Sequence, residues 1–205
     1  MSYIETISAD EAEGAVLEMY EHQQKHWGYV PNYVKSFSHR PEVMARWGRL
    51  LAEIRRPLAP RTFELVTFAA AHELRHTPCS LAHGNALTPF FTNEQILAIA
   101  RQEDLDFLTE AEREMVSFSR KVARDAAAID AVDVQRLKDC GLDDGTIFDI
   151  AATAAGRAFF TKVLDAIGSL PDAAFRSIDE DLRVPLTVGR PISTLDDEVM
   201  KGISD

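Results

Sequence analysis

The sequence predicts an all-α protein that folds as one domain. Apolar side chains recur at helical spacing along most of the 205 residues, and Ala and Leu are frequent. No segment shows the strict alternation of apolar and polar residues that a half-buried strand requires. With 46% hydrophobic and 27% charged residues, a chain of this length can bury a substantial core.

Proline, glycine and capping residues set the expected helix boundaries. The predicted helices cover residues 9–25, 41–55, 60–75, 78–87, 93–101, 109–124, 130–139, 143–155 and 157–168. From Val184 onward, prolines, a glycine and a run of acidic residues predict an extended segment. We therefore expect a helical domain over residues 1–184 and an extended tail over residues 185–205, packed on a neighbouring subunit.

Two pairs of segments about fifty residues apart are similar to each other. Residues 58–68 align with residues 108–118, and residues 92–100 align with residues 143–151. A duplicated helical unit produces such an offset. The domain is thus expected to contain two related units, at about 58–100 and 108–151, of which only the first carries the cysteine and histidine discussed below.

Charge and cysteine content exclude several classes of partner. The net charge of −11 argues against binding to nucleic acid or to an anionic membrane surface. No apolar run is long enough to cross a bilayer, and the N-terminal residues lack the layout of a signal peptide. We expect a cytoplasmic protein whose two cysteines, Cys79 and Cys140, remain thiols.

The segment around Cys79 carries most of the chemistry. Thr77 is expected to cap a helix whose first residue is Pro78, which places Cys79 in the first turn. The positive end of the helix dipole favours a thiolate there. His83, four residues on, lies on the same face of the helix. The pair is typical of a reactive thiol, although a small buried residue at a helix start is an equally ordinary interpretation of Cys79.

Three further polar residues near this segment allow more than one interpretation. Glu64 lies among apolar residues, so it is either a partly buried carboxyl that exchanges protons or a solvent-facing residue of the first helical turns. His72 and His76 would join Cys79 and His83 in one metal-binding stripe if a single helix ran through all four. Pro78 interrupts such a helix, so we expect neither a bound metal nor another cofactor. Cys140 is interpreted as structural.

These residues resemble a known family. The chain is similar to the carboxymuconolactone decarboxylase and alkylhydroperoxidase D-like superfamily, in particular its peroxidase-related branch. The peroxidase motif of that family is a glutamate followed, twelve residues on, by Cys-x-x-Cys-x-x-x-His. Glu64, Cys79 and His83 match the glutamate, the second cysteine and the histidine with the spacing kept. Further likeness lies in residues 28–32, 38–43, 81–84 and 188–192.

The motif has one departure. His76 stands where the dithiol members have their first cysteine, which closes a disulfide after the second cysteine has attacked a peroxide. This chain therefore keeps the residue that matches the attacking thiol and lacks its resolving partner. The decarboxylase members lack the cysteine pair, so the resemblance alone does not fix the reaction.

The resemblance implies an alkylhydroperoxidase D-like helical bundle, assembled as a homo-oligomer, a trimer or a hexamer. It also implies a hydroperoxide reductase of the peroxiredoxin type, in which the catalytic residues are Cys79, His83 and Glu64. His76 is expected to modulate the thiol by adding positive charge. Turnover would then consume a small-molecule hydroperoxide and an external thiol reductant.

Two alternatives stay open at the level of sequence. The first is a non-redox decarboxylase or lactone-processing enzyme that uses Glu64 and His83 as acid and base, with Arg75 and His76 binding a small carboxylate. The second is a non-catalytic oligomeric protein, in which Cys79 is buried and its pKa equals or exceeds that of a free thiol.

Overall fold

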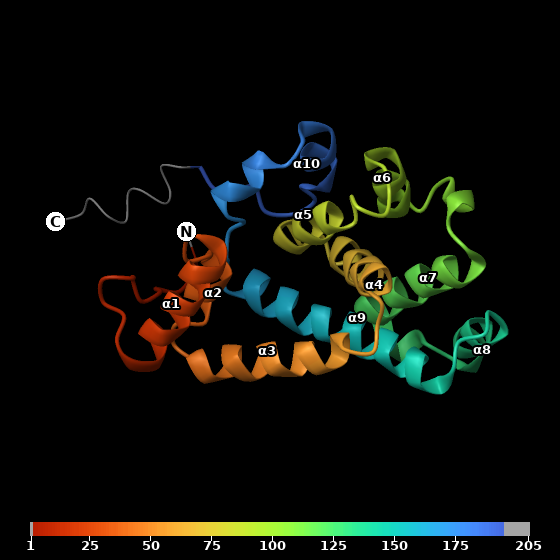
Figure 1. Cartoon of the computed structure of the whole chain (residues 1–205), viewed down its shortest axis with the longest axis horizontal. Coiled ribbons are helices and arrows are strands. Elements are labelled where there is room, and N and C mark those ends of the chain that lie inside the picture. The colour runs from red at the N-terminus through yellow and green to blue at the C-terminus, as the bar shows by residue number, and fades with distance from the viewer. Residues whose placement is uncertain (1, 195–205) are drawn as a thin grey trace.

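The computed structural model describes residues 2–194, which form ten α-helices and three short 3-10 helices and contain no strand, so the predicted all-α class is confirmed (Figure 1). The α-helices are α1 (Gly14–Trp27), α2 (Asn32–Ser36), α3 (Pro41–Arg55), α4 (Pro60–Glu73), α5 (Thr77–Ala86), α6 (Asn93–Arg101), α7 (Glu110–Asp125), α8 (Ala131–Asp139), α9 (Asp144–Ala166) and α10 (Glu180–Leu186). None of these helices is long and apolar enough to span a membrane.

Helix starts follow the local signals in the sequence. Helices α3 and α4 each have a proline in the first turn, and α6, α7 and α8 each begin with a capping box in which the side chains of two residues bond each other's backbone N–H groups. The observed bounds of α3 and α6 equal the predicted ones. Helix α1, by contrast, begins at Gly14 instead of residue 9, because Ser8 and Glu11 form a side-chain hydrogen bond in a turn that precedes it.

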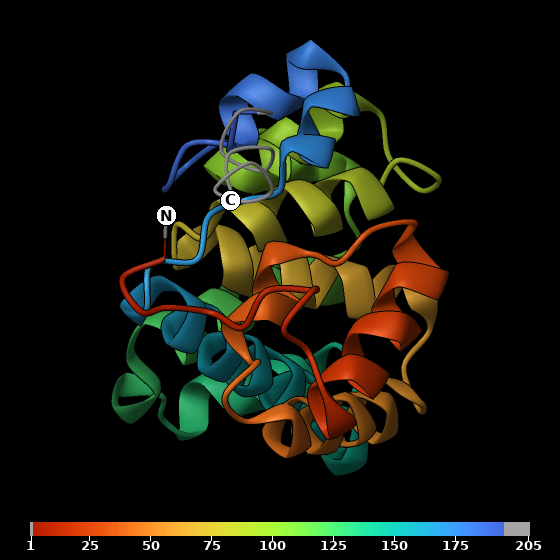
Figure 2. The ribbon, with the colours of Figure 1, turned by 90° about the vertical axis from the view of Figure 1, so that its left-hand side faces the viewer.

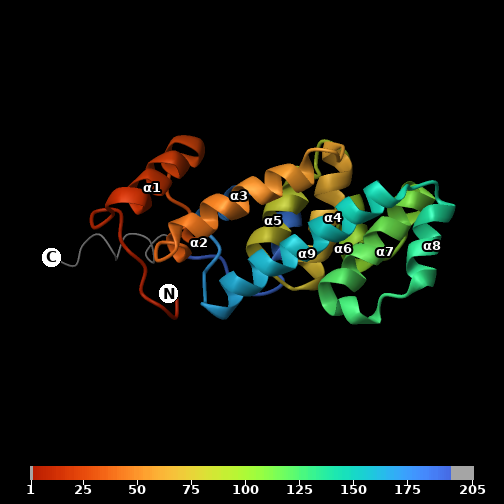
Figure 3. The ribbon, with the colours of Figure 1, turned by 90° about the horizontal axis from the view of Figure 1, so that it is seen from below.

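Helix α9 is continuous where the sequence predicted two helices. The predicted break fell at Gly156, but this residue lies inside the helix, against the side chain of Trp47. An added Cβ at Gly156 would come within 3.0 Å of the Trp47 ring. The glycine therefore allows α3 and α9 to approach closely, and Figure 3 shows these helices side by side.

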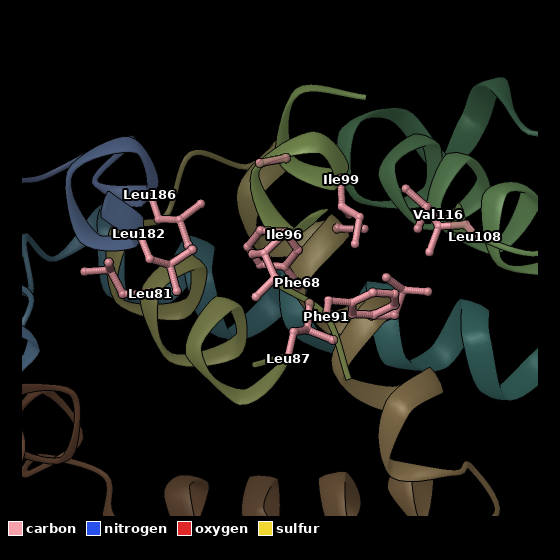
Figure 4. Close-up of a cluster of buried hydrophobic side chains, with 13 residues drawn as sticks. Phe68, Leu81, Leu87, Phe91, Ile96, Ile99, Leu108, Val116, Leu182 and Leu186 are labelled. Carbon is pink, nitrogen blue, oxygen red and sulfur yellow. The ribbon is translucent and has the colours of Figure 1, made fainter. Parts of the chain in front are cut away.

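The core is built around α4. Eight of its residues are buried, and α4 contacts α5, α7 and α9. One buried cluster lies between α4, α5, α6 and α10, where Phe68 and Leu81 meet Leu182 and Leu186 (Figure 4). The two units proposed from the sequence correspond to α4–α6 and to α7 through the first part of α9. Their descent from a duplication stays a prediction.

The segment after α10 packs on its own chain. Helix α10 extends to Leu186, one residue beyond the expected start of the tail at residue 185, and the extended backbone begins at Thr187. In Figure 2 helix α10, in blue, lies over α5, which it contacts. The N–H of Gly189 donates to Thr77 Oγ1 at 2.8 Å, and Arg190 donates to the carbonyl of Asp165 at 3.0 Å. Residues 195–205 of the predicted tail lie outside the described residues.

Gly189 provides a test of this docking. A Cβ at position 189 would lie 2.1 Å from the carbonyl oxygen of Arg75, a backbone atom that cannot move aside cheaply. We expect Gly189→Ala to lower the free energy of unfolding by about 1–3 kcal/mol, because overpacking forces backbone shifts. Urea denaturation measures this loss, and limited proteolysis should cut the variant near residue 189 faster than the wild type.

Gly48→Ala is the matched control. Gly48 lies in α3, and an added Cβ there meets no atom within 4 Å. This substitution should stabilise the protein by about 0.5–1 kcal/mol through helix propensity. Equal effects of the two substitutions would contradict the proposed packing of the segment after α10.

Candidate functional site

Helix α5 positions Cys79 in its first turn, but the N-cap is His76, not Thr77 as predicted. The Nδ1 atom of His76 accepts the backbone N–H of Cys79 at 3.3 Å. The residue is 1% exposed. Burial, and then the charges of Arg157 and Arg190, lower the pKa of His76 to about 3. His76 is therefore neutral near pH 7, and the prediction that it adds positive charge beside Cys79 is wrong.

Cys79 lies against an arginine that sequence reasoning missed. The thiol is 5% exposed, and Nη1 of Arg157, on α9, donates a hydrogen bond to its Sγ atom at 3.3 Å. Burial raises the pKa of the Cys79 thiol, and the charge and hydrogen bond of Arg157 offset this only in part. The prediction that the helix dipole makes Cys79 a thiolate is thus wrong, because desolvation outweighs the favourable charges.

Glu64 and His83 form a buried pair. Oε2 of Glu64 lies 2.6 Å from Nδ1 of His83, and the two side chains are 12% and 17% exposed. Burial raises the pKa of Glu64, but the hydrogen bond and charge of His83 outweigh it, so the pKa is lowered overall. Burial and the charge of Arg157 lower the pKa of His83 against the opposing effect of Glu64. Near pH 7 this pairs an ionised carboxylate with a neutral imidazole that donates from Nδ1, which leaves Nε2 as an acceptor.

The Glu64–His83 pair lies at one end of the hairpin formed by α4 and α5. Glu64 lies in the second turn of α4, and His83 lies near the end of α5. Helices α4 and α5 turn back on each other through a three-residue connection, so the beginning of one faces the end of the other.

Cys79, His83 and Arg157 open onto one cavity of about 530 Å³. Its walls are mainly apolar, and the aromatic residues among them are Trp27, Tyr29, Tyr33, Trp47, Phe160 and Phe175. The Phe160 ring contacts Trp47 and Tyr33, with ring centroids 5.9 and 5.7 Å apart. Cavities of this size and character take small organic molecules, so the thiol faces a space much larger than hydrogen peroxide requires.

His72 and Cys140 do not join this site. The predicted interruption places His72 on α4, where Nδ1 lies 3.1 Å from Ser80 Oγ and burial lowers the pKa to about 4. Within residues 2–194 no group of three or more His, Cys, Asp or Glu side chains is arranged to hold a metal ion. Cys140 is a free thiol that caps the end of α8.

Arg75, which the sequence suggested as a ligand for an anion, does not line the cavity. It follows α4 with a positive φ of 55°, is exposed, and donates from Nε to the carbonyl of Val188 at 3.1 Å. The buried cation in the cavity wall is Arg157. A single arginine within the apolar run of residues 150–160 was the sequence signal for it, since an unpaired charge rarely occupies a buried helix face.

Comparison with solved structures supports the predicted fold. An alkylhydroperoxidase AhpD core protein of Ralstonia eutropha JMP134, described as an uncharacterized peroxidase-related protein, matches with a TM-score of 0.67 and 19% identity over 92% of this chain and 98% of its own. A peroxidase-related protein of Silicibacter sp. TM1040 matches with a TM-score of 0.64 and 19% identity over 85% of this chain and 91% of its own.

A third match is the debrominase Bmp8, with 16% identity over 88% of this chain and 94% of that one. The TM-score is 0.67 for its apo form and 0.66 for a cysteine-to-alanine variant in complex with 2,3,4-tribromopyrrole. No protein-family model and no curated protein sequence matches the chain. The chain has the AhpD-like fold, and the resemblance read from the motif is confirmed at that level.

The buried neutral state of His76 predicts a pH-dependent stability. Its folded pKa of about 3 is below the ordinary value of 6.5, so the unfolded state binds more protons as the pH falls, and stability is lost in that direction. Between about pH 7.5 and pH 5 this one residue should remove about 2 kcal/mol from the free energy of unfolding. His76→Asn keeps a capping oxygen without a titrating group, so urea denaturation should show a loss that is smaller by about that amount. Parallel pH profiles of the two proteins would contradict this account.

Proposed function

We propose that the protein is a thiol-dependent reductase of organic hydroperoxides. The observation that carries this proposal is that Cys79, which accepts a hydrogen bond from Arg157, lines the same aromatic cavity as His83, the partner of Glu64. A nucleophile, a proton acceptor and a buried cation are the parts that reduction of an apolar peroxide needs.

The reaction balances with these groups. The thiol proton of Cys79 passes to Nε2 of His83 as sulfur attacks the distal oxygen of the hydroperoxide. The O–O bond breaks, an S–O bond forms, and the leaving alkoxide takes the proton back from His83 and departs as an alcohol. Glu64 stabilises the imidazolium that exists between these two transfers.

The sulfenic acid on Cys79 is then reduced from outside. A first external thiol forms a mixed disulfide with release of water, and a second thiol releases Cys79 with formation of an external disulfide. His76 occupies the position of a resolving cysteine and cannot take part, because it has no thiol. The external reductant is therefore part of the proposal.

The structural relatives support a small apolar substrate. Bmp8, with the same fold, holds a flat halogenated ring, and two other matches are described as peroxidase-related. The cavity of this chain presents aromatic walls suited to such a molecule.

The trimer or hexamer that the resemblance implies is also part of the proposal. Exposed apolar side chains such as Phe148 and Phe159 could form contacts between subunits.

The buried state and raised pKa of Cys79 also match the non-catalytic alternative. That alternative assigns no role to the cavity or to the hydrogen bond from Arg157. It also leaves the short Glu64–His83 contact as a purely structural one. We therefore favour a reactive thiol that stays protonated near pH 7 and transfers its proton to His83 as it attacks.

Peroxide reactivity should reside in Cys79 alone. With cumene hydroperoxide, trapping of a sulfenic acid followed by intact-mass spectrometry should show one modification, formed faster than on glutathione between pH 7 and pH 8.5. Cys140→Ser should keep this reaction, and Cys79→Ser should lose it. A Cys79 no more reactive than glutathione across that pH range would contradict the proposed function.

His83 should determine the rate of that first step. Replacing it by Gln removes the group that takes the thiol proton, and we expect sulfenic acid to form about 100-fold more slowly. His72→Gln is the matched control, because His72 is, like His83, a partly buried histidine but does not line the cavity. Similar rates for both variants and the wild type would exclude His83 as the proton acceptor.

The second candidate function is acid–base catalysis without redox chemistry. The 2.6 Å contact between Glu64 and His83 favours it, because His83 lines the cavity and can exchange a proton there without the sulfur of Cys79. Cys79→Ser distinguishes the two candidates, since it should abolish hydroperoxide reduction and spare acid–base turnover of a lactone or carboxylate substrate.

A further inference from the structure

Arg157 is a buried cation in the wall of the cavity. It lies on α9 and is 5% exposed. Its guanidinium carbon lies 5.4 Å from the centre of the Phe160 ring, and Nη1 donates to the sulfur of Cys79. Arg157, Cys79 and Phe160 all line the cavity.

The guanidinium is incompletely satisfied. Its Nε atom is buried and has no hydrogen-bond partner among residues 2–194. Arg157 takes part in none of the ion pairs between described residues. An aromatic face and a neutral sulfur are weak partners for a charge that has left water, and a buried charge without a counter-ion costs several kcal/mol.

The nearby acidic groups are engaged elsewhere. Glu64 bonds to His83, Asp165 lies closest to Arg190 and His76, and the carboxylate of Asp172 accepts the backbone N–H of Asn32 at 2.7 Å. Burial raises the pKa of Cys79, so the thiol is not a counter-ion near pH 7. Within residues 2–194 Arg157 thus forms no direct ion pair, although its charge acts on Glu64 and helps to lower the pKa of that carboxyl.

We infer that Arg157 binds the carboxylate of an aromatic acid, whose ring occupies the apolar part of the cavity. Arginine pairs with a carboxylate through parallel N–H donors, and the one hydrogen bond of this guanidinium within residues 2–194 is that from Nη1 to the sulfur of Cys79. The aromatic walls supply the contact area for the ring. This inference deepens the proposed function, since it rests on the same cavity as the substrate site and makes the substrate an acid that also carries the reducible group.

The net charge of the whole protein opposes the binding of an anion. At −11, the long-range field repels an anion, so any preference for a carboxylate must come from a local cation. A neutral compound of the same shape measures that preference directly. Because neither probe below contains a peroxide, the measurement is independent of the reactivity of Cys79.

Isothermal titration calorimetry of the reduced wild-type protein with 1-naphthoate and with 1-naphthamide tests the inference. The two probes have the same ring system and differ in charge. We expect naphthoate to bind at least about tenfold more tightly. Equal affinity, tighter binding of the amide, or no binding of either probe would overturn the inference.

Arg157→Met identifies the residue responsible. It removes the charge and keeps an apolar side chain of similar length, so the preference for naphthoate should disappear while the amide binds as before. Arg157→Lys keeps the charge without the planar fork and should retain part of the preference. A preference for naphthoate that persists in Arg157→Met would overturn the assignment.

The inference and the proposed function can fail separately. A protein that prefers naphthoate but whose Cys79 does not react with hydroperoxides would keep the aromatic-acid site and lose the reductase. A reactive Cys79 without the preference would keep the reductase and remove the carboxylate from its substrate.

Discussion

Burial of helix α4 is the constraint on which the rest of the molecule depends. Leu65, Val66 and the run Phe68–Ala71 have no exposed surface, so this helix is apolar on nearly its whole circumference. Other helices must therefore cover it on several sides, and α5, α7 and α9 do so. The site follows from this arrangement, since α5 brings Cys79 and α9 brings Arg157 to α4, the helix that carries Glu64.

The same burial determines the charge states of the site. The N-terminus of a helix carries only a partial positive charge, so its stabilisation of a thiolate is limited. Transfer of the whole anion from water to a closed interior costs more free energy than this stabilisation provides. Cys79 is at the N-terminus of α5 and still has a raised pKa. Position on a helix is visible in a sequence, but desolvation is set by neighbours that come from other helices.

This difference explains which features the sequence could predict. Helix class, the capping of α6 and α7, and the grouping of Glu64, Cys79 and His83 depend on local signals or on a motif. The continuity of α9 depends on how Trp47 packs against Gly156, which is a tertiary contact.

The neutral state of His76 and the contact between Arg157 and Cys79 depend on the tertiary structure in the same way, because the partners are 78 or more residues apart or become buried only on folding. No helical periodicity could have predicted them.

The pKa values of Cys79 and His83 are shifted in opposite directions, which gives the site a defined resting protonation state. Burial is the largest influence on both groups. It raises the pKa of the Cys79 thiol against the charge of Arg157, and it lowers the pKa of the His83 imidazole together with that charge. Near pH 7 the proton therefore stays on sulfur, and the imidazole remains neutral. In the proposed mechanism the thiol gives its proton to His83 only during attack on the hydroperoxide, and the carboxylate of Glu64 stabilises the imidazolium so formed. Under that proposal, burial keeps the resting thiol protonated until a substrate enters the cavity.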